Sequence, residues 1–176
     1  DTETMEAAIT FAETGHLCLG TLHANSANQT IERIINFFPE ERRNQLLMDL
    51  SANLRAIVSQ RLIRNSKGRL MPAVEVMINT AHIADLIKND EIDSIKDAIN
   101  QSVSPGSQTF EQALYKLFKD GDISREEAMR NADSASNLSS LIDFSQTSKM
   151  KTYDPSAPHA GKTAAPTAGA ADFGSI

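Results

Sequence analysis

The spacing of apolar residues in the first third of the chain predicts three helices, the first two separated by a short extended run. Apolar positions three or four residues apart indicate amphipathic helices over residues 2–14, 26–38 and 39–54. Between the first two helices, Leu17–Leu22 is a short apolar run that is typical of a buried strand. We expect Thr2 or Thr4 to cap the first helix and Ser26 to cap the second, because hydroxyl side chains accept hydrogen bonds from free N–H groups.

The pattern then changes to a hairpin followed by helices. Residues 56–64 and 70–78 are rich in β-branched and apolar residues, and the turn sequence Asn-Ser-Lys-Gly separates them, which predicts a β-hairpin. Helical spacing returns over residues 80–132, with a weaker helix through Phe144. From Lys149 onward the chain is mainly Ala, Gly, Pro, Ser and Thr. It has too few large apolar residues for their burial to offset the entropy lost on ordering.

These patterns indicate an α/β fold class with three parts. We expect an α/β core over residues 1–79, a small helical subdomain over residues 80–145 and a disordered tail over residues 146–176. The chain lacks an initiator methionine, and its acidic first residues do not resemble a signal peptide. We therefore expect it to be a fragment of a longer protein.

Composition narrows the possible functions. The formal charge of −6 argues against nucleic-acid binding, which needs clustered Lys and Arg. No run of about 18 apolar residues is present, so the sequence predicts no membrane-spanning helix. Cys18 is the single cysteine, which excludes an intramolecular disulfide and a cysteine-based zinc site and fits a reducing compartment.

Two histidines bracket the apolar run and are the first candidates for chemistry. His16 precedes it and His23 follows it, while Thr21 and Asn25 add hydrogen-bonding groups near its end, where ligands often bind in α/β sheets. A structural role, in which both imidazoles simply terminate a strand, is the alternative. A zinc site is disfavoured because the two histidines lie seven residues apart and no third ligand is near. We predict no metal ligand in this segment.

The sequence around these histidines resembles the ATPases that retract type IV pili, the PilT/PilU family of the secretion-ATPase superfamily. The resemblance is carried by Thr14-Gly15-His16-Leu17 and Thr21-Leu22-His23, which match the His box of this family, and by residues 30–39 after it. The first four residues, Asp-Thr-Glu-Thr, match the end of the Walker B segment. The resemblance extends over about residues 1–132.

Two departures indicate the branch within this family. Pilus assembly and secretion members carry a tetracysteine zinc module after the Gln-Arg-Leu segment, whereas here residues 60–64 lead directly into a turn. The C-terminal helical motif linked to retraction in PilT corresponds to His82–Asn89, where both arginines and the glutamate are replaced. The first departure favours the retraction branch over the assembly branch, and the second, with the long tail, favours a PilU-like protein over a PilT-like one.

The resemblance implies the C-terminal part of a RecA-like P-loop ATPase domain that uses ATP and Mg²⁺. The chain contains no Gly-x-x-x-x-Gly-Lys-Ser/Thr loop, and the Walker B glutamate would lie just before Asp1. We therefore expect the chain to supply the sensor half of the site and to be inactive alone.

The family resemblance also assigns roles to individual residues. His23 would sense the γ-phosphate, with Thr21 orienting its ring or the attacking water, and these two are the catalytic candidates. His16, His23, Asn25 and Arg33 are the candidates for nucleotide binding. Arg33 is as well explained by a solvated helix charge, and Arg61 and Arg64 by charges at the rim of a strand.

The implied assembly is a homo-hexamer at the cytoplasmic face of the inner membrane. It would act beside a PilT-like paralogous ATPase and on the inner-membrane platform protein of the pilus, with Asp85, Lys88 and Asn89 as exposed positions toward that protein. No nucleic-acid partner is expected. Two alternatives remain: a non-catalytic adaptor domain that binds a motor or platform, and an assembly or type II secretion ATPase.

Overall fold

A computed structural model describes residues 1–150, with side chains described for residues 1–144. Two strands and eight α-helices lie in this part of the chain, together with two 3₁₀ turns, Glu40–Arg42 and Ile92–Ser94. The strands are β1 (Ala56–Arg64) and β2 (Leu70–Ile78). The helices are α1 (Thr2–Glu13), α2 (Ala27–Ile35), α3 (Arg43–Asn53), α4 (Ala81–Lys88), α5 (Ile95–Gln101), α6 (Phe110–Lys119), α7 (Arg125–Asn131) and α8 (Ala135–Met150).

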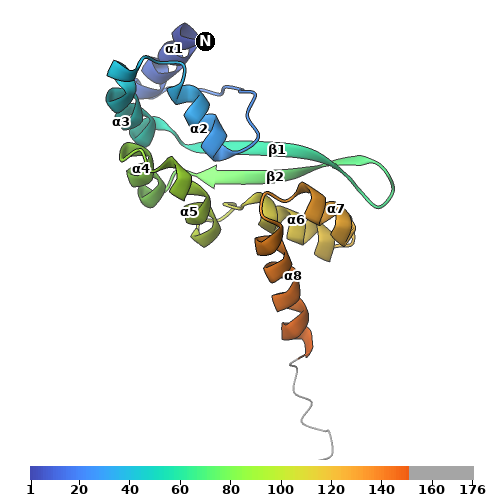
Figure 1. The fold of residues 1–176 in the computed structure, drawn as a ribbon. Helices are drawn as coiled ribbons and strands as arrows, with labels where there is room; N and C mark the ends of the chain where they lie inside the picture. Colours follow the sequence, from blue (N-terminus) through green and yellow to red (C-terminus); the bar gives the residue numbers. More distant parts are fainter. Residues whose placement is uncertain (151–176) are drawn as a thin grey trace, which may run out of the picture.

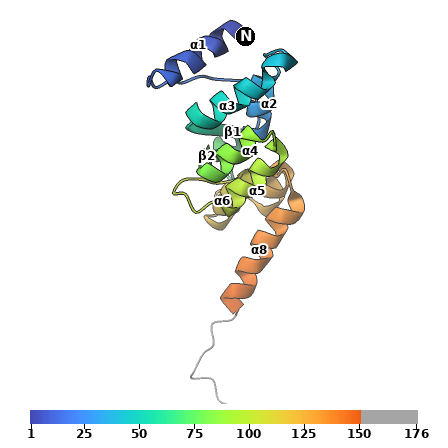
Figure 2. The same cartoon turned by 90° about the vertical axis from the view of Figure 1, so that its left-hand side faces the viewer.

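The predicted β-hairpin is confirmed at both ends. β1 and β2 pair antiparallel from Ala56 opposite Ile78 to Arg64 opposite Leu70. Side chains alternate between the two faces of a strand, and the face that carries Ile57, Ile63 and Met77 is buried. Helices pack against the buried face of this hairpin, with α1 and α8 at opposite ends of the molecule in both views (Figures 1 and 2).

The strand predicted over Leu17–Leu22 is wrong. This run is an extended loop outside any sheet, and the side chains of Leu17 and Leu19 are 80% and 90% exposed. A strand needs a neighbour to pair its N–H and C=O groups. Among residues 1–150, β1 and β2 form the one sheet and pair with each other. The apolar run therefore has no strand to join in the described part of the chain.

Two hydrophobic clusters share the hairpin. The first joins α2, α3, α4 and α5 to the end of the hairpin that carries Ile57 and Met77. The second joins α6, α7 and α8 to the turn end, at Ile63 and Ala73. The division between these clusters falls after α5, whereas the expected division of domains at residue 80 remains a prediction. The predicted start of the tail at residue 146 is wrong, because the helical backbone of α8 includes residues 146–150; residues 151–176 lie outside the described part.

Helix termini follow the expected chemistry with one exception. The Ser26 side chain accepts a hydrogen bond from the N–H of Gln29 and begins α2 as predicted. The N-cap of α1 is Asp1, whose carboxylate accepts from the Thr4 N–H at 2.8 Å, rather than Thr2 or Thr4. Gly15, with a φ of +89°, follows α1 and turns the chain into the histidine-bearing loop.

The described helices include no candidate for a membrane span. Within residues 1–150, none combines the length and the apolar character that a membrane span requires.

Candidate functional site

The loop between α1 and α2 carries four of the five candidate residues. His16 is turned back toward α1, because its Nδ1 lies 3.0 Å from the Thr14 hydroxyl and its ring meets the edge of Phe11 at 5.8 Å between centroids. Among the described residues, no hydrogen bond or ring contact joins His16 to His23. The two histidines are therefore separate features rather than one paired site.

His23 and Arg33 are brought together through the main chain. The Arg33 Nη1 donates to the His23 carbonyl oxygen at 2.6 Å, across the first turns of α2. The His23 side chain is exposed, and within residues 1–144 its imidazole makes no hydrogen bond, as is also true of the Thr21 hydroxyl. Arg33 thus fixes the backbone of His23 and leaves its ring available to a ligand.

Asn25 is also held by its backbone. Its N–H donates to the Gln29 side chain at 3.1 Å, and its carbonyl oxygen accepts from Arg61 Nη2 at 3.2 Å. Directly after the N-cap of α2, the Ala27 N–H donates to the Glu75 carboxylate at 2.8 Å. The end of the loop is therefore anchored to α2 and to both strands of the hairpin.

A buried polar cluster that the sequence analysis missed lies between the two hydrophobic clusters. Glu75 and Glu111 are only 2% and 3% exposed. Lys96 Nζ contacts Glu111 at 2.9 Å and Asp133 at 3.2 Å, and Asp133 also pairs with Arg61. The sequence did contain a signal for Glu75, which lies between two valines in an apolar strand. A charged residue in such a position is rarely buried without partners, so it indicates a buried polar contact.

Burial and charge shift the pKa values within this cluster. Burial raises the pKa of Glu75 above its usual range; the Ala27 N–H bond opposes this rise, and the negative charge of Asp133 adds to it. Burial also acts to raise the pKa of Asp133, but the hydrogen bond and charge of Arg61, with help from Lys96, hold it below its usual range. Burial acts to lower the pKa of Lys96, but Glu111 and Asp133 outweigh it and raise that pKa.

The raised pKa of Glu75 predicts a pH-dependent stability. Between the unfolded pKa of about 4.3 and the higher folded value, the folded state binds more protons, so the contribution of Glu75 to stability is lost as pH rises through that window. Glu75→Gln keeps an oxygen for the Ala27 N–H without a charge. We expect it to melt at a higher temperature than wild type at pH 7, and the gain to vanish below about pH 4.

Thermal unfolding of the intact protein across pH checks this expectation. Glu32→Gln, at an exposed position on α2, is the matched control and should leave the melting temperature unchanged at each pH. A Glu75→Gln variant that is less stable than wild type at pH 7 would show that the charge of Glu75 stabilises the fold.

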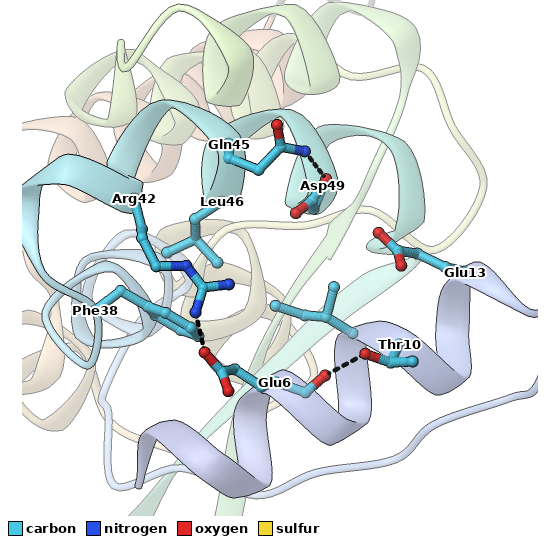
Figure 3. Close-up of a pocket in the computed structure, with 9 residues that line it drawn as sticks. Glu6, Thr10, Glu13, Phe38, Arg42, Gln45, Leu46 and Asp49 are labelled. Atoms are coloured by element: carbon cyan, nitrogen blue, oxygen red, sulfur yellow. Dashed lines mark hydrogen bonds and ion pairs between the residues drawn. The ribbon is translucent and has the colours of Figure 1, made fainter.

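The two hollows described on the surface lie away from the candidate residues. One, of about 240 Å³, lies between α1 and α3, where Arg42 pairs with Glu6 beside Phe38 (Figure 3). The other, of about 330 Å³, is lined by residues of α2, Arg43 and Asp90. Neither includes a predicted site residue. Within residues 1–144, no group of three His, Cys, Asp or Glu side chains is placed to hold a metal ion.

The part of the chain that contains this loop and hairpin is similar in sequence to known proteins. Residues 1–84 match the family described as Type II/IV secretion system protein. The chain is 52% identical over 141 residues to the type IV pilus ATPase PilU of Pseudomonas aeruginosa, covering 80% of this chain and 37% of PilU. Identity to the type IV pilus retractation ATPase PilT of the same organism is 41%, covering 78% of this chain and 40% of that protein.

A solved structure agrees with these matches. The crystal structure of the pilus retraction motor PilT with bound ADP superposes with a TM-score of 0.70 at 38% identity, covering 80% of this chain and 39% of that chain. The present chain thus spans roughly two fifths of the length of the relatives that it matches.

The fold and these matches together define an α/β ATPase fold of the secretion-ATPase class, as the sequence predicted. Within that class, the chain is similar to the pilus ATPases PilU and PilT over about four fifths of its length.

Proposed function

We propose that the intact protein is a PilU-like hexameric ATPase that uses Mg–ATP to power retraction of type IV pili and twitching motility. The observation that carries this proposal is the 52% identity to PilU over 80% of the chain. Within the family, a protein of this chain's sequence would act beside a PilT-like paralogous ATPase and on the inner-membrane platform protein. Its place would be the cytoplasmic face of that membrane.

His23 is the proposed sensor of the γ-phosphate. Phosphoryl transfer depends mainly on positioning and on stabilising charge, so a motor needs a group that responds to the presence or loss of that phosphate. A neutral imidazole donates one hydrogen bond, and a protonated one donates two. The ring of His23 is exposed while Arg33 holds its carbonyl oxygen, which suits a side chain that must meet a ligand from a fixed backbone.

The other candidates have supporting roles in this proposal. Thr21 lies two residues before His23 with an exposed hydroxyl, which would orient the imidazole or the attacking water. His16 keeps Nε2 for the nucleotide, since Nδ1 lies against Thr14. Asn25 would contribute its exposed side-chain amide, because its backbone groups are already bonded. Arg33 would reach the nucleotide with the donors that it does not give to His23.

The chain alone is proposed to be inactive. Residues 1–176 contain no Gly-x-x-x-x-Gly-Lys-Ser/Thr loop, so the backbone cradle and lysine that hold the phosphates must come from elsewhere. Mg²⁺ would bind together with the phosphates of ATP, as is usual where it is held by one or two protein ligands and the substrate. A hexamer places nucleotide between neighbouring subunits, so an isolated segment would lack both the cradle and the neighbour.

The experiment that tests this function compares cells with and without the protein. We expect deletion of its gene to reduce pilus retraction, observed with fluorescently labelled pili, while pili are still assembled. Failure of the deletion cells to assemble pili would instead support the assembly ATPase. If a variant that hydrolyses no ATP restores normal retraction to the deletion cells, the result would support the adaptor.

A further inference from the structure

Arg61 contacts both the histidine-bearing loop and the C-terminal helices. It lies on the buried face of β1, between the two hydrophobic clusters, with its side chain 23% exposed. Its guanidinium donates to the carbonyl oxygens of Asn25 at 3.2 Å and Asn131 at 3.3 Å, and pairs with the carboxylate of Asp133. Its central carbon lies 3.9 Å from the centre of the Phe110 ring, a cation–π distance.

The position of Asp133 is itself fixed by two helices. Lys96 of α5 donates to Asp133 at 3.2 Å and to Glu111 of α6 at 2.9 Å. Glu111 also accepts from the N–H of Ser134, the residue after Asp133. A displacement of α6 or of the start of α8 would therefore move the carboxylate to which Arg61 is bonded.

On the loop side, the contact is made two residues after His23. Asn25 is followed by Ser26, the N-cap of α2, so the Arg61 bond fixes the residue directly before the N-cap. Within residues 1–144, Arg61 is the side chain whose hydrogen bonds join this loop to the segment between α7 and α8. Arg33 bonds the loop from α2, and Glu75 of β2 bonds the first residue of α2.

We propose that Arg61 is a positioning residue that couples the placement of the His23 loop to the placement of α6 and α8. A guanidinium presents five N–H donors in a rigid planar fork, so one side chain can bond three groups from two separate segments. A lysine carries a compact ammonium on a flexible stem and cannot reproduce that geometry. The catalytic consequence of this coupling rests on the function proposed above, whereas the positioning itself does not.

Backbone hydrogen exchange in the intact protein tests the positioning directly. The Asn25 and Ala27 amides are hydrogen-bonded to side chains, so their exchange reports how well the loop end is held. In Arg61→Gln and Arg61→Lys we expect faster exchange in peptides covering residues 24–27, with β1 and β2 unchanged. Arg69→Gln, at an exposed position beside the hairpin turn, is the matched control and should match wild type.

A second variant approaches the same coupling from the helical side. Asp133→Asn keeps Arg61 but removes the charge that anchors it, and should also speed exchange at residues 24–27. Unchanged exchange there in both Arg61 and Asp133 variants would overturn the proposal. A rise spread equally over β1, β2 and the loop would overturn it too, because Arg61 would then merely support the fold.

ATP kinetics of the same proteins give the functional readout. If His23 is misplaced rather than removed, Arg61→Gln should lower kcat about tenfold with KM within about twofold, and Arg61→Lys should not restore it. Equal kcat in wild type and Arg61→Gln would contradict a catalytic consequence of the coupling. A wild-type protein without ATP turnover would refute the proposed function, while the exchange experiment would still decide the positioning role.

Discussion

Replacing His23 by alanine should lower kcat for ATP hydrolysis by the intact protein about 100-fold, the scale found when one preorganised hydrogen-bond donor to a transition state is removed. The expected loss is large because the imidazole of His23 is exposed, while the His23 carbonyl oxygen is held by a 2.6 Å hydrogen bond from Arg33. Steady-state turnover under saturating Mg–ATP measures it. The fold should persist, since the side chain is exposed and packs in neither hydrophobic cluster.

The matched control for this variant is His82→Ala. His82 is an exposed imidazole on α4, outside the loop that carries the candidate residues. We expect its turnover to stay within about twofold of wild type, because a solvated surface side chain contributes little to a distant step. Normal turnover in His23→Ala would remove His23 from the sensor role.

Replacing Phe110 by alanine should produce the largest loss of stability, about 3–5 kcal/mol, from lost apolar contact and the cavity that remains. Phe110 is 0% exposed in the second hydrophobic cluster and begins α6. Its ring also lies under the Arg61 guanidinium, so the variant removes the surface on which Arg61 rests. Chemical denaturation of the intact protein measures the change.

Phe144→Ala is the control for this prediction. Phe144 is the same residue type on α8 but is 77% exposed, so its truncation removes little buried surface. We expect a change within about 0.5 kcal/mol, as for surface substitutions generally. If the two variants were equally stable, Phe110 would not be a central member of the cluster.

The features predicted well from the sequence are those set by local patterns. β1 and β2 carry alternating apolar residues on each side of a glycine-containing turn, and both strands have the predicted ends. Ser26 caps the helix that it was expected to cap, because its hydroxyl accepts a hydrogen bond from a free N–H group. Periodicity and capping are properties of a few adjacent residues, so one sequence is enough to find them.

The features missed depend on groups far apart in the chain. Leu17–Leu22 has a strand-like sequence, but a strand forms only where another backbone can pair with it. The cluster around Arg61 and Asp133 joins side chains more than seventy positions apart in sequence, which no local pattern reveals. The sequence suggests a rim charge at Arg61, whereas the structure pairs Arg61 with Asp133 and places its guanidinium over the ring of buried Phe110.

The site residues followed from the family resemblance more than from spacing. The structure brings Arg33 to the His23 backbone and Arg61 to the Asn25 backbone, contacts that the sequence did not specify. It keeps His16 against Thr14, apart from His23. The roles of these residues toward a nucleotide remain predictions.

Mg–ATP turnover by the purified intact protein, measured beside pilus retraction in cells that carry the same variants, tests the central claim most directly. The account predicts that wild type hydrolyses ATP and supports retraction, and that His23→Ala loses both while the protein remains folded. Full retraction by a folded His23→Ala protein, or by a wild-type protein with no ATP turnover, would contradict it.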